Sequence, residues 1–463
     1  MRKSSFPQLS LALALALAFS VPPAMAEGTA TAAHSQVVVP AGFSSVGEGH
    51  AAAWSLLGDP DLAPLVARAM QANTDLRQAL ARLEMARARA GATGAAALPQ
   101  GGLGLARQAG DPSPAPWAGS VALDWEIDLS GRQAKQRRGA RARTDEAVAN
   151  LEAARLAVAA EVARTWFQLR GAREARVLRA QSLAAQSDIE GLTGDLVALG
   201  RAAPGDLARS RAESATESAL LAQANDRVFA LEARLAVLLG ETPGAWRAPQ
   251  PGALAPLHWQ PVAVPDPAAL LRERPDVRAA GHALAASGED ARAAGAARFP
   301  SLSLGGLLGF VAGDLSGLFS SAADERSQGA TLSWSLFSLP RLQAQYRESQ
   351  AGTRLALAVY DQVVLEAIED TEVALQRHAS ASEQARLRLE AALQSRVAAD
   401  AATARYEEGA SPYLEALLAR RDATAAQLAA VEALVVQRVA VIDVLRALGT
   451  PPVAAQQAAA TAG

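Results

Sequence analysis

The sequence predicts a mixed α+β membrane protein with an internal duplication, in which a small membrane sheet continues into very long helices. Long stretches of the chain align with later stretches in the same order. Two runs, 131–200 and 341–409, contain no proline and are rich in alanine, leucine, arginine and glutamate, which are strong helix formers. Four shorter segments alternate apolar with small or polar residues, two of them over about ten positions, the length of a tilted membrane strand.

The duplication covers most of the chain. Residues 75–99 align with 276–300, and residues 123–243 align with 332–452. The spacing changes once, by roughly eight residues, between Pro99 and Trp125, as expected at an exposed loop tip. Repeats of this length are too long for a small solenoid unit, so they predict two elongated halves. The aligned pairs include Asp75-Leu76-Arg77 with Asp276-Val277-Arg278, Trp125 with Trp334, Gly200 with Gly409, Asp206 with Glu415, and Arg211 with Arg420.

The N-terminus has the pattern of a secretory signal peptide over residues 1–26. Arg2 and Lys3 precede an apolar run from Leu9 to Val21, and cleavage is expected between Ala26 and Glu27. The alternative is a single membrane anchor helix, but the run is shorter than the ~20 residues that a span needs. No later segment has an apolar run of spanning length, so the sequence predicts no membrane-spanning helix.

Charge and composition exclude several classes of function. The chain has 44 basic and 47 acidic residues, and removal of Arg2 and Lys3 leaves 42 against 47. A net charge of −5 does not favour nucleic acid as a partner. Cysteine is absent, which excludes disulfides, thiolate metal sites and a lipid on an N-terminal cysteine. The five histidines have no metal-ligand spacing, so we expect surface histidines, no metal and no cofactor.

Changes of period divide the chain into segments. Residues 27–58 are expected to form an extended leader, 244–266 a proline-rich linker, and 450–463 a disordered tail. The first repeat, 59–243, should contain a helix that starts at Asp59-Pro60-Asp61, a β-hairpin over 99–130, a long helix over 131–200 and a return helix over 205–240. The second repeat, 267–449, should contain a helix, a β-hairpin over 300–339, a long helix over 341–409 and a return helix over 412–448.

Four membrane strands cannot function alone. An open sheet edge in lipid leaves backbone groups unpaired, and single-chain barrels need at least about eight strands. The strands must therefore close by oligomerisation. The long helices, roughly 100 Å each at 1.5 Å per residue, exceed what a globular domain uses and suit a coiled-coil tube.

At this point the sequence resembles the TolC-like outer-membrane efflux factors, in particular the OprM/NodT-type branch. The motifs are Trp54-Ser-Leu-Leu-Gly-Asp-Pro-Asp-Leu62, Leu271-Arg-Glu-Arg-Pro-Asp-Val-Arg278 and Arg405-Tyr-Glu-Glu-Gly-Ala-Ser-Pro-Tyr-Leu414, in order and within the duplication. The resemblance implies a homotrimer with a twelve-stranded β-barrel in outer-membrane lipid, continued into the periplasm by a helical barrel. It also implies a passive exit duct without an active site. Its partners would be a periplasmic adaptor protein and an inner-membrane transporter of the RND type.

The resemblance also implies roles for particular residues. In the family, helix tips carry acids near the pore axis, and Glu415 matches the first of these. Leu418 replaces the second, Asp422 lies a further turn along, and Asp206 is the equivalent acid of the first repeat; each acid could instead be a plain exposed helix residue. Gly200 and Gly409 match adaptor contacts, although glycine also ends helices generally. Trp125 and Trp334 are expected at the membrane interface, and Arg211 and Arg420 in salt bridges between helices.

Other functions stay open at this stage. The same duct architecture serves type I protein secretion. A periplasmic adaptor also has long helical hairpins, but it should carry a single hairpin without a duplication of this length. An enzyme or sensor on a stalk lacks support, because no catalytic constellation, metal cluster or phosphate loop is present in the sequence. Drugs, metal ions, small aromatic acids and secreted proteins all remain candidate substrates.

Overall fold

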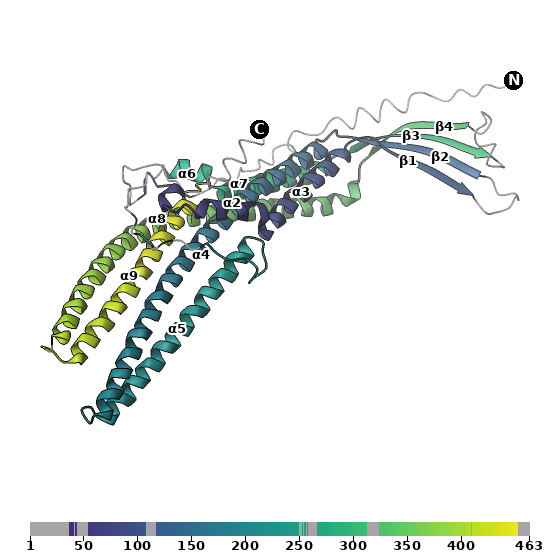
Figure 1. The fold of residues 1–463 in the computed structure, drawn as a ribbon. Helices are drawn as coiled ribbons and strands as arrows, with labels where there is room; N and C mark the ends of the chain where they lie inside the picture. The colour runs from purple at the N-terminus through teal and green to yellow at the C-terminus, as the bar shows by residue number, and fades with distance from the viewer. Residues whose placement is uncertain are drawn as a thin grey trace, which may run out of the picture.

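The structure is a computed structural model that describes residues 37–40, 42–43, 54–107, 117–249, 252, 254–255, 257, 266–312, 324–408 and 410–451. The expected signal peptide, its cleavage site at Ala26 and Glu27, most of the leader and the tip glycine Gly409 lie outside these residues. The molecule is elongated, with a β-sheet at one end and the tips of two long helical hairpins at the other (Figure 1).

The two repeats have the same order of elements. The first contains a 3₁₀ turn η2 (Trp54–Leu57), α2 (Leu62–Ala72), α3 (Thr74–Ala95), β1 (Gln100–Arg107), β2 (Trp117–Ile127), α4 (Arg132–Ala198) and α5 (Pro204–Leu238). The second contains α6 (Pro267–Glu273), α7 (Pro275–Ala296), β3 (Ser301–Ala312), β4 (Asp324–Ser333), a 3₁₀ turn η5 (Leu336–Ser338), α8 (Leu339–Glu407) and α9 (Tyr413–Ala447). The short turn η5 was not expected from the sequence.

The four strands form one antiparallel sheet in the order β1-β2-β3-β4. Gln100 lies opposite Asp124 in the first hairpin, and Ser301 lies opposite Ser333 in the second. These are equivalent positions under the sequence alignment, so the duplication holds at the level of strand register. Strands β1 and β4 are the edges of the sheet.

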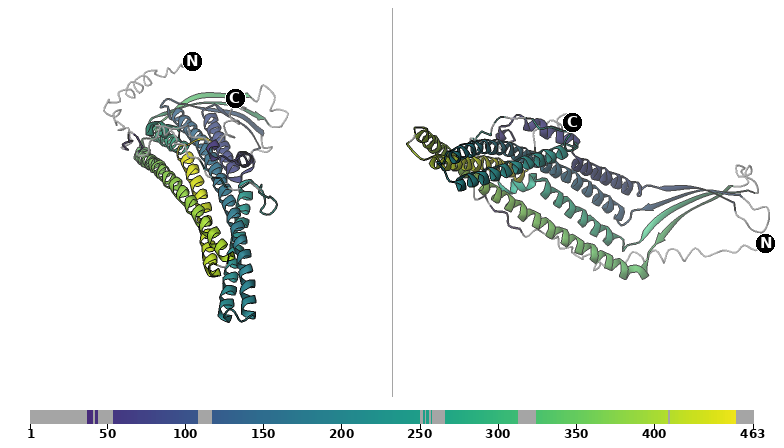
Figure 2. Two further views of the ribbon diagram at one scale, coloured as in Figure 1. Left: turned by 60° about the vertical axis from the view of Figure 1, so that its left-hand side comes forward. Right: turned by 60° about the horizontal axis from the view of Figure 1, so that its bottom comes forward.

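Four helices continue the sheet as one curved layer. They lie side by side in the order α3, α4, α7, α8 (Figure 2, right). Helices α4 and α8 contain 67 and 69 residues and run on past this layer, where each pairs with its return helix, α5 or α9. None of the described helices is both long and apolar enough to cross a membrane.

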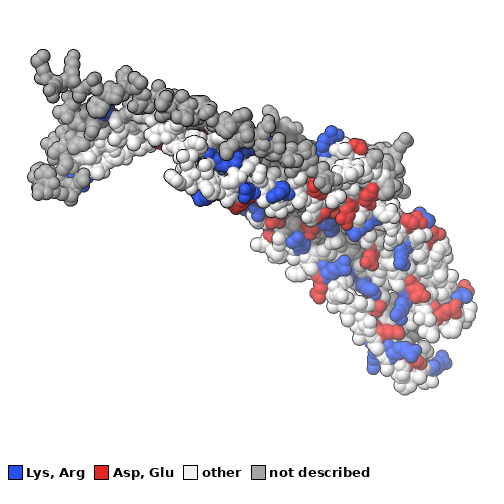
Figure 3. Space-filling view, turned by 180° about the vertical axis from the view of Figure 1, so that it is seen from behind, with Lys and Arg blue, Asp and Glu red and all other residues white. Residues whose placement is uncertain are grey.

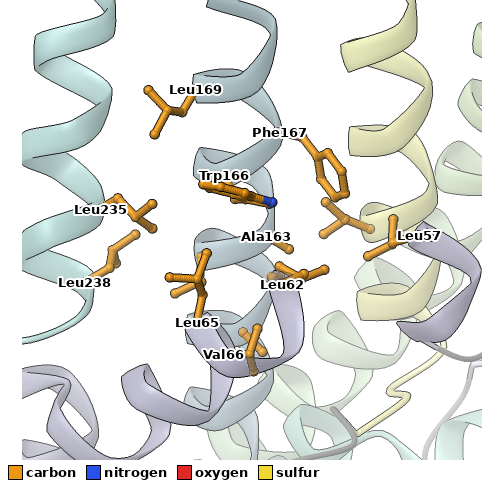
Figure 4. Close-up of a cluster of buried hydrophobic side chains, with 14 of the residues drawn as sticks. Leu57, Leu62, Leu65, Val66, Ala163, Trp166, Phe167, Leu169, Leu235 and Leu238 are labelled. Atoms are coloured by element: carbon orange, nitrogen blue, oxygen red, sulfur yellow. The ribbon is translucent and has the colours of Figure 1, made fainter. Parts of the chain in front are cut away.

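The main core lies where the layer meets the hairpins. Trp166, Phe167 and Leu169 of α4 are fully buried there, together with Leu235 of α5 (Figure 4). Helix α2 adds Leu62, Leu65 and Val66, so it packs across α4 instead of extending the layer (Figure 4). The cluster also contains Ile442 and Leu445 of α9, so it joins the two halves. Burial of a side chain of this size typically contributes about 1.5–3 kcal/mol.

The first helix of each repeat is broken, a feature that the sequence analysis missed in the first repeat. Between α2 and α3, Asn73 takes an extended conformation and its side chain accepts hydrogen bonds from the N–H groups of Asp75 and Leu76, which caps α3. In the second repeat, Pro275 begins α7 at the equivalent place. One break is therefore produced by two different local signals.

The start of the first repeat differs from the expectation. The first helix was expected to start at Asp59-Pro60-Asp61, but α2 begins at Leu62. The Asp59 carboxylate accepts hydrogen bonds from the N–H of Asp61 and the indole of Trp166, both at 2.9 Å, and from Arg170. Of the tail expected over 450–463, the structure describes only Thr450 and Pro451, and the rest lies outside the described residues. The carbonyl of Thr450 accepts a hydrogen bond of 3.1 Å from the indole of Trp54, so the end of the second repeat is tied to the start of the first.

Candidate functional site

The two faces of the sheet differ in chemistry. Residues directly opposite one another in an antiparallel sheet point to the same side. One face carries most of the large apolar side chains, including Leu103, Val121, Trp125, Leu304, Leu308 and Leu332. The other carries mainly glycine, alanine, serine and threonine, together with Asp124 and Glu126. This division is typical of a sheet with lipid on one side and water on the other.

The charged residues follow the same division along the molecule. On the face shown in Figure 3, Lys, Arg, Asp and Glu lie over the helices, and the described surface of the strands carries few of them. Across the helical layer the charges form pairs between helices, such as Arg138 with Glu289 at 3.0 Å and Arg278 with Glu152 at 2.6 Å. The helical part therefore has the surface of a water-exposed structure.

The predicted interface tryptophans lie at the junction of strands and helices. The indole N–H of Trp125 donates to the carbonyl of Ala97 at 3.2 Å, and that of Trp334 donates to the carbonyl of Arg298 at 3.1 Å. These two contacts are equivalent in the duplication. Both rings remain partly exposed, and Phe337, three residues after Trp334, is fully exposed. An aromatic ring with a hydrogen-bonded polar edge suits the boundary between lipid and water.

Each repeat is closed by an equivalent polar contact. The side-chain N–H of Asn73 donates to the carbonyl of Leu238, at the end of α5, with a distance of 2.9 Å. In the second repeat Arg274 takes this role and donates to the carbonyl of Ala447 at 3.0 Å and to that of Ala367 at 3.2 Å. Local sequence does not reveal this closure, although Arg274 stands in the motif Leu271-Arg-Glu-Arg-Pro-Asp-Val-Arg278.

The charge of Arg274 is compensated where it lies. The guanidinium is buried and lies 2.6 Å from Asp276 and 3.5 Å from Asp370. Burial disfavours the charged form, but the hydrogen bonds and negative charges of the two carboxylates outweigh it and raise the pKa of Arg274. Burial alone would raise the pKa of Asp276, but the hydrogen bond and the charge of Arg274 lower it. The contacts of Arg274 therefore hold the start of α7 against α8 and α9.

The linker between the repeats is held by α4 and α9. Arg170 donates to the carbonyl of Gly252 at 2.8 Å, and the Glu174 carboxylate accepts from the N–H of Leu254 at 3.2 Å. Arg438 of α9 donates to the carbonyl of Ala255 and lies over the ring of Phe167, 5.4 Å from its centroid. Burial, together with the charge of Arg170, lowers the pKa of Arg438 to about 10. The linker therefore binds both repeats.

One histidine contradicts the expectation of surface histidines. His378 of α8 is 3% exposed, with the Ser382 hydroxyl 3.3 Å from its Nε2 atom. Burial lowers the pKa of His378 to about 4, so the ring is neutral near pH 7. Among the described residues, no group of three or more histidine, aspartate and glutamate side chains is placed to hold a metal ion. His378 thus belongs to the packing between helices.

The helix tips hold the predicted pore residues. Gly200, in the left-handed conformation with φ of +68°, ends α4, and an added Cβ would meet no atom within 4 Å. Asp206 lies in the first turn of α5 and accepts a hydrogen bond of 3.3 Å from the N–H of Ala203. This exposed acid therefore caps its own helix. Arg211 forms the expected bond between helices, 3.5 Å from Glu190 of α4.

The second tip differs from the first. Glu415 lies in the first turn of α9, and its carboxylate forms an ion pair with Arg405 of α8 across the turn. Leu418 and Asp422 lie further along α9, and both are exposed. The position equivalent to Arg405 in the first repeat is Leu196, so only the second tip has this pair. Arg405 was not among the residues expected at the tip.

A groove runs between the two hairpins near these tips. Its cavity measures about 550 Å³ and is lined by residues of both hairpins, among them Arg209, Glu213, Asp400, Leu418 and Arg421. Glu415, Asp422 and Asp206 do not line it. Leu418 therefore contributes to the groove, whereas the three acids do not line it. Because Glu415, Leu418 and Asp422 are spaced by three and four residues on α9, they share one face of that helix. The groove also brings basic side chains close to the tips.

Comparison with known proteins identifies the family. The profile of the family described as "Outer membrane efflux protein" matches residues 65–241 and 267–450. The chain belongs to the outer membrane efflux protein family. The two matched segments correspond to the two repeats. The match confirms the predicted family, the outer-membrane location and a role in efflux.

Individual members of the family are similar over most of their length. Outer membrane protein OprJ of Pseudomonas aeruginosa is 30% identical over 416 residues, which is 85% of each chain. Nodulation protein T of Rhizobium leguminosarum bv. trifolii is 27% identical, over 81% of this chain and 82% of its own. The solved outer-membrane channel OprN superimposes with a TM-score of 0.79 at 30% identity, over 90% of this chain and 98% of its own. These proteins form a family of channels and transport proteins.

Proposed function

We propose that this chain forms the trimeric exit duct of an efflux pump and conducts solutes passively through the outer membrane. The observation that carries the proposal is the sheet: four strands, one apolar face, one polar face and two open edges, β1 and β4. Edges of this kind cannot remain unpaired in lipid. Three copies would supply twelve strands, and the helical layers would close into a tube below them.

The proposal includes two partners. A duct of this kind supplies no energy, so we assign the energy to an inner-membrane transporter of the RND type, connected through a periplasmic adaptor. We place adaptor contacts at the tip glycines Gly200 and Gly409. Relatives named as the outer membrane proteins of whole pumps support this assembly, for example the toluene efflux pump outer membrane protein TtgF of Pseudomonas putida.

The same relatives support a proposal for the substrate class. TtgF is named for toluene, and OpmQ of Pseudomonas aeruginosa is named as a pyoverdine export protein. We propose that this duct exports small organic solutes, in preference to the type I secretion of proteins. Deletion of the gene should raise cellular accumulation of a fluorescent organic substrate, and expression of the intact chain should reverse it. Unchanged accumulation with all partners present would contradict the proposal.

The gate is assigned to the periplasmic tips. We propose that the pore narrows where the hairpins of three copies converge, at Glu415, Leu418, Asp422 and Asp206. We also propose that Trp125 and Trp334 mark the periplasmic boundary of the outer membrane. The pair between Arg405 and Glu415 modifies this gate, because a carboxylate paired with arginine contributes less field along the axis than a free one. In planar bilayers the purified protein should give discrete, cation-selective steps of low conductance; anion-selective steps would contradict the assignment.

A further inference from the structure

The outer helices of the layer, α3 and α8, lie at its opposite edges (Figure 2, right). Between them, α4 of the first repeat packs against α7 of the second. Under the duplication, α4 corresponds to α8 and α7 corresponds to α3. The contact equivalent to that between α4 and α7 would therefore join α8 to α3. These two helices cannot meet within one chain, so the equivalent contact needs a second copy.

One ion pair of the contact between α4 and α7 has a counterpart on the outer helices α3 and α8. Arg278 of α7 binds Glu152 of α4 with an N–O distance of 2.6 Å. The equivalent residues are Arg77 of α3 and Asp361 of α8, so both charges are retained. The Arg77 side chain is exposed, and its guanidinium forms no ion pair within the described part of the chain. The Oδ1 atom of Asp361 is shielded from solvent and has no hydrogen-bond partner among the described residues. Such an acceptor is costly unless a partner arrives.

A second ion pair is reversed. Arg143 of α4 binds Asp290 of α7, and Gly139, one turn earlier on α4, leaves room beside the same carboxylate. An added Cβ at Gly139 would lie 3.3 Å from the Asp290 carboxylate. The residue of α3 that is equivalent to Asp290 is an arginine, Arg89.

The residues facing this position are exchanged as well. Arg143 is replaced by Gly352, and Gly139 is replaced by Glu348. The acid and the base have thus changed sides, and the glycine has moved by one turn. Arg89 and Glu348 are exposed, and neither forms an ion pair within the described residues. A matched exchange of this kind preserves attraction between the two faces.

The strands at the edges obey the same relation. In the inner contact between β2 and β3, Leu123 lies opposite Gly306. Their equivalents are Leu332 of β4 and Leu105 of β1, which lie on the two open edges and are each 62% exposed. The relation therefore places Leu332 directly opposite Leu105 of a neighbouring copy.

We infer that the contact between copies of this chain repeats the contact between its own halves: Asp361 binds Arg77 of the next copy, Glu348 binds its Arg89, and Leu332 pairs with its Leu105. The inference rests on the proposed trimeric duct and specifies which faces close it and in which register. Each contact occurs three times around a closed ring, so small pairwise terms add.

Cross-linking tests the inference directly, because the natural sequence contains no cysteine. Arg77→Cys with Asp361→Cys, treated with a short bis-maleimide in the detergent-solubilised protein, should give covalent dimers and trimers on a denaturing gel. The matched control is Glu152→Cys with Arg278→Cys, which should link within one chain and leave its mass unchanged. Leu105→Cys with Leu332→Cys should oxidise to a disulfide between chains, whereas Leu105→Cys with Ala330→Cys, two residues out of register, should not.

Charge reversal supplies a second readout. Arg77→Glu and Asp361→Arg should each lose most of the trimer in mild detergent, and Arg77→Asp combined with Asp361→Arg should restore it. Arg87→Glu, at an exposed position of the same helix on the side away from Arg89, is the control and should retain the trimer.

The outcomes separate the inference from the proposal on which it rests. Suppose that the variant with both Arg77→Cys and Asp361→Cys forms a trimer of full mass but gives no cross-link between chains, while the control pair is linked. That result would overturn the inference and leave the trimeric duct standing. A monomer of the natural protein would overturn both.

Discussion

The contact between the two helical hairpins leads to a sharp prediction at Gly171. This glycine of α4 faces α9, and an added Cβ would lie 2.3 Å from the Cγ2 atom of Val435. Valine in a helix has one strongly preferred rotamer, so it cannot turn away cheaply. Overpacking of this kind costs about 1–3 kcal/mol, and the gain in helix propensity from glycine to alanine returns at most about 1 kcal/mol. We expect Gly171→Ala to destabilise the protein by about 1–2 kcal/mol.

Two matched variants isolate the cause. Gly191→Ala changes a glycine of the same helix where an added Cβ meets no atom within 4 Å, so it should stabilise the protein by up to about 1 kcal/mol. Val435→Ala removes the methyl group that an added Cβ at Gly171 would meet. Val435→Ala should therefore lower the free energy of unfolding less in the Gly171→Ala background than in the natural sequence. The measurement is the denaturant midpoint of helical circular dichroism in detergent. Equal stability of Gly171→Ala and Gly191→Ala would refute the packing between α4 and α9.

The remaining predictions concern charge. The pKa of His378 is lowered to about 4 in the folded protein, below the unfolded value near 6.5. The neutral buried ring therefore contributes stability above pH 6.5, and this contribution is lost as the pH falls. Between pH 7.5 and pH 5 the free energy of unfolding of the natural protein should fall by about 2 kcal/mol more than that of His378→Gln in chemical denaturation. Arg405→Gln should increase cation selectivity in planar bilayers and Glu415→Gln should decrease it. A shift in the same direction for both would contradict the proposed placement of these two charges beside the pore. Arg274→Met removes the partner of Asp276 and the buried donor to the carbonyls of Ala447 and Ala367, whereas Asp370 keeps Arg446 at 4.0 Å. The free energy of unfolding should fall by about 1–3 kcal/mol, and an unchanged value in chemical denaturation would contradict the structural role of Arg274.

The duplicated pattern allowed much of the fold to be predicted. Period and proline placement gave α4 and α8 to within about two residues of the expected bounds, because helix starts and ends are local properties. The break at Asn73 was missed, although the Asn73-Thr74-Asp75 sequence is a recognisable capping signal. A sustained apolar period across the break concealed it.

The site was harder to predict, because its contacts join distant parts of the chain. Arg405 pairs with Glu415 only because the turn brings α8 beside α9, and neither residue alone indicates the pair. The local sequence at Asp59 suits a helix start, but the tertiary fold places Trp166 and Arg170 beside its carboxylate. His378 could not be distinguished from a surface histidine by spacing alone. The tip acids Glu415, Asp422 and Asp206 remain predictions about the assembled pore.

The number of chains in the particle tests the central claim most directly. Light scattering of the purified protein in mild detergent, corrected for bound detergent, gives this number without reference to any partner. The four-stranded sheet with two open edges predicts three times the mass of one chain. A stable monomer in which β1 and β4 remain unpaired would contradict the account.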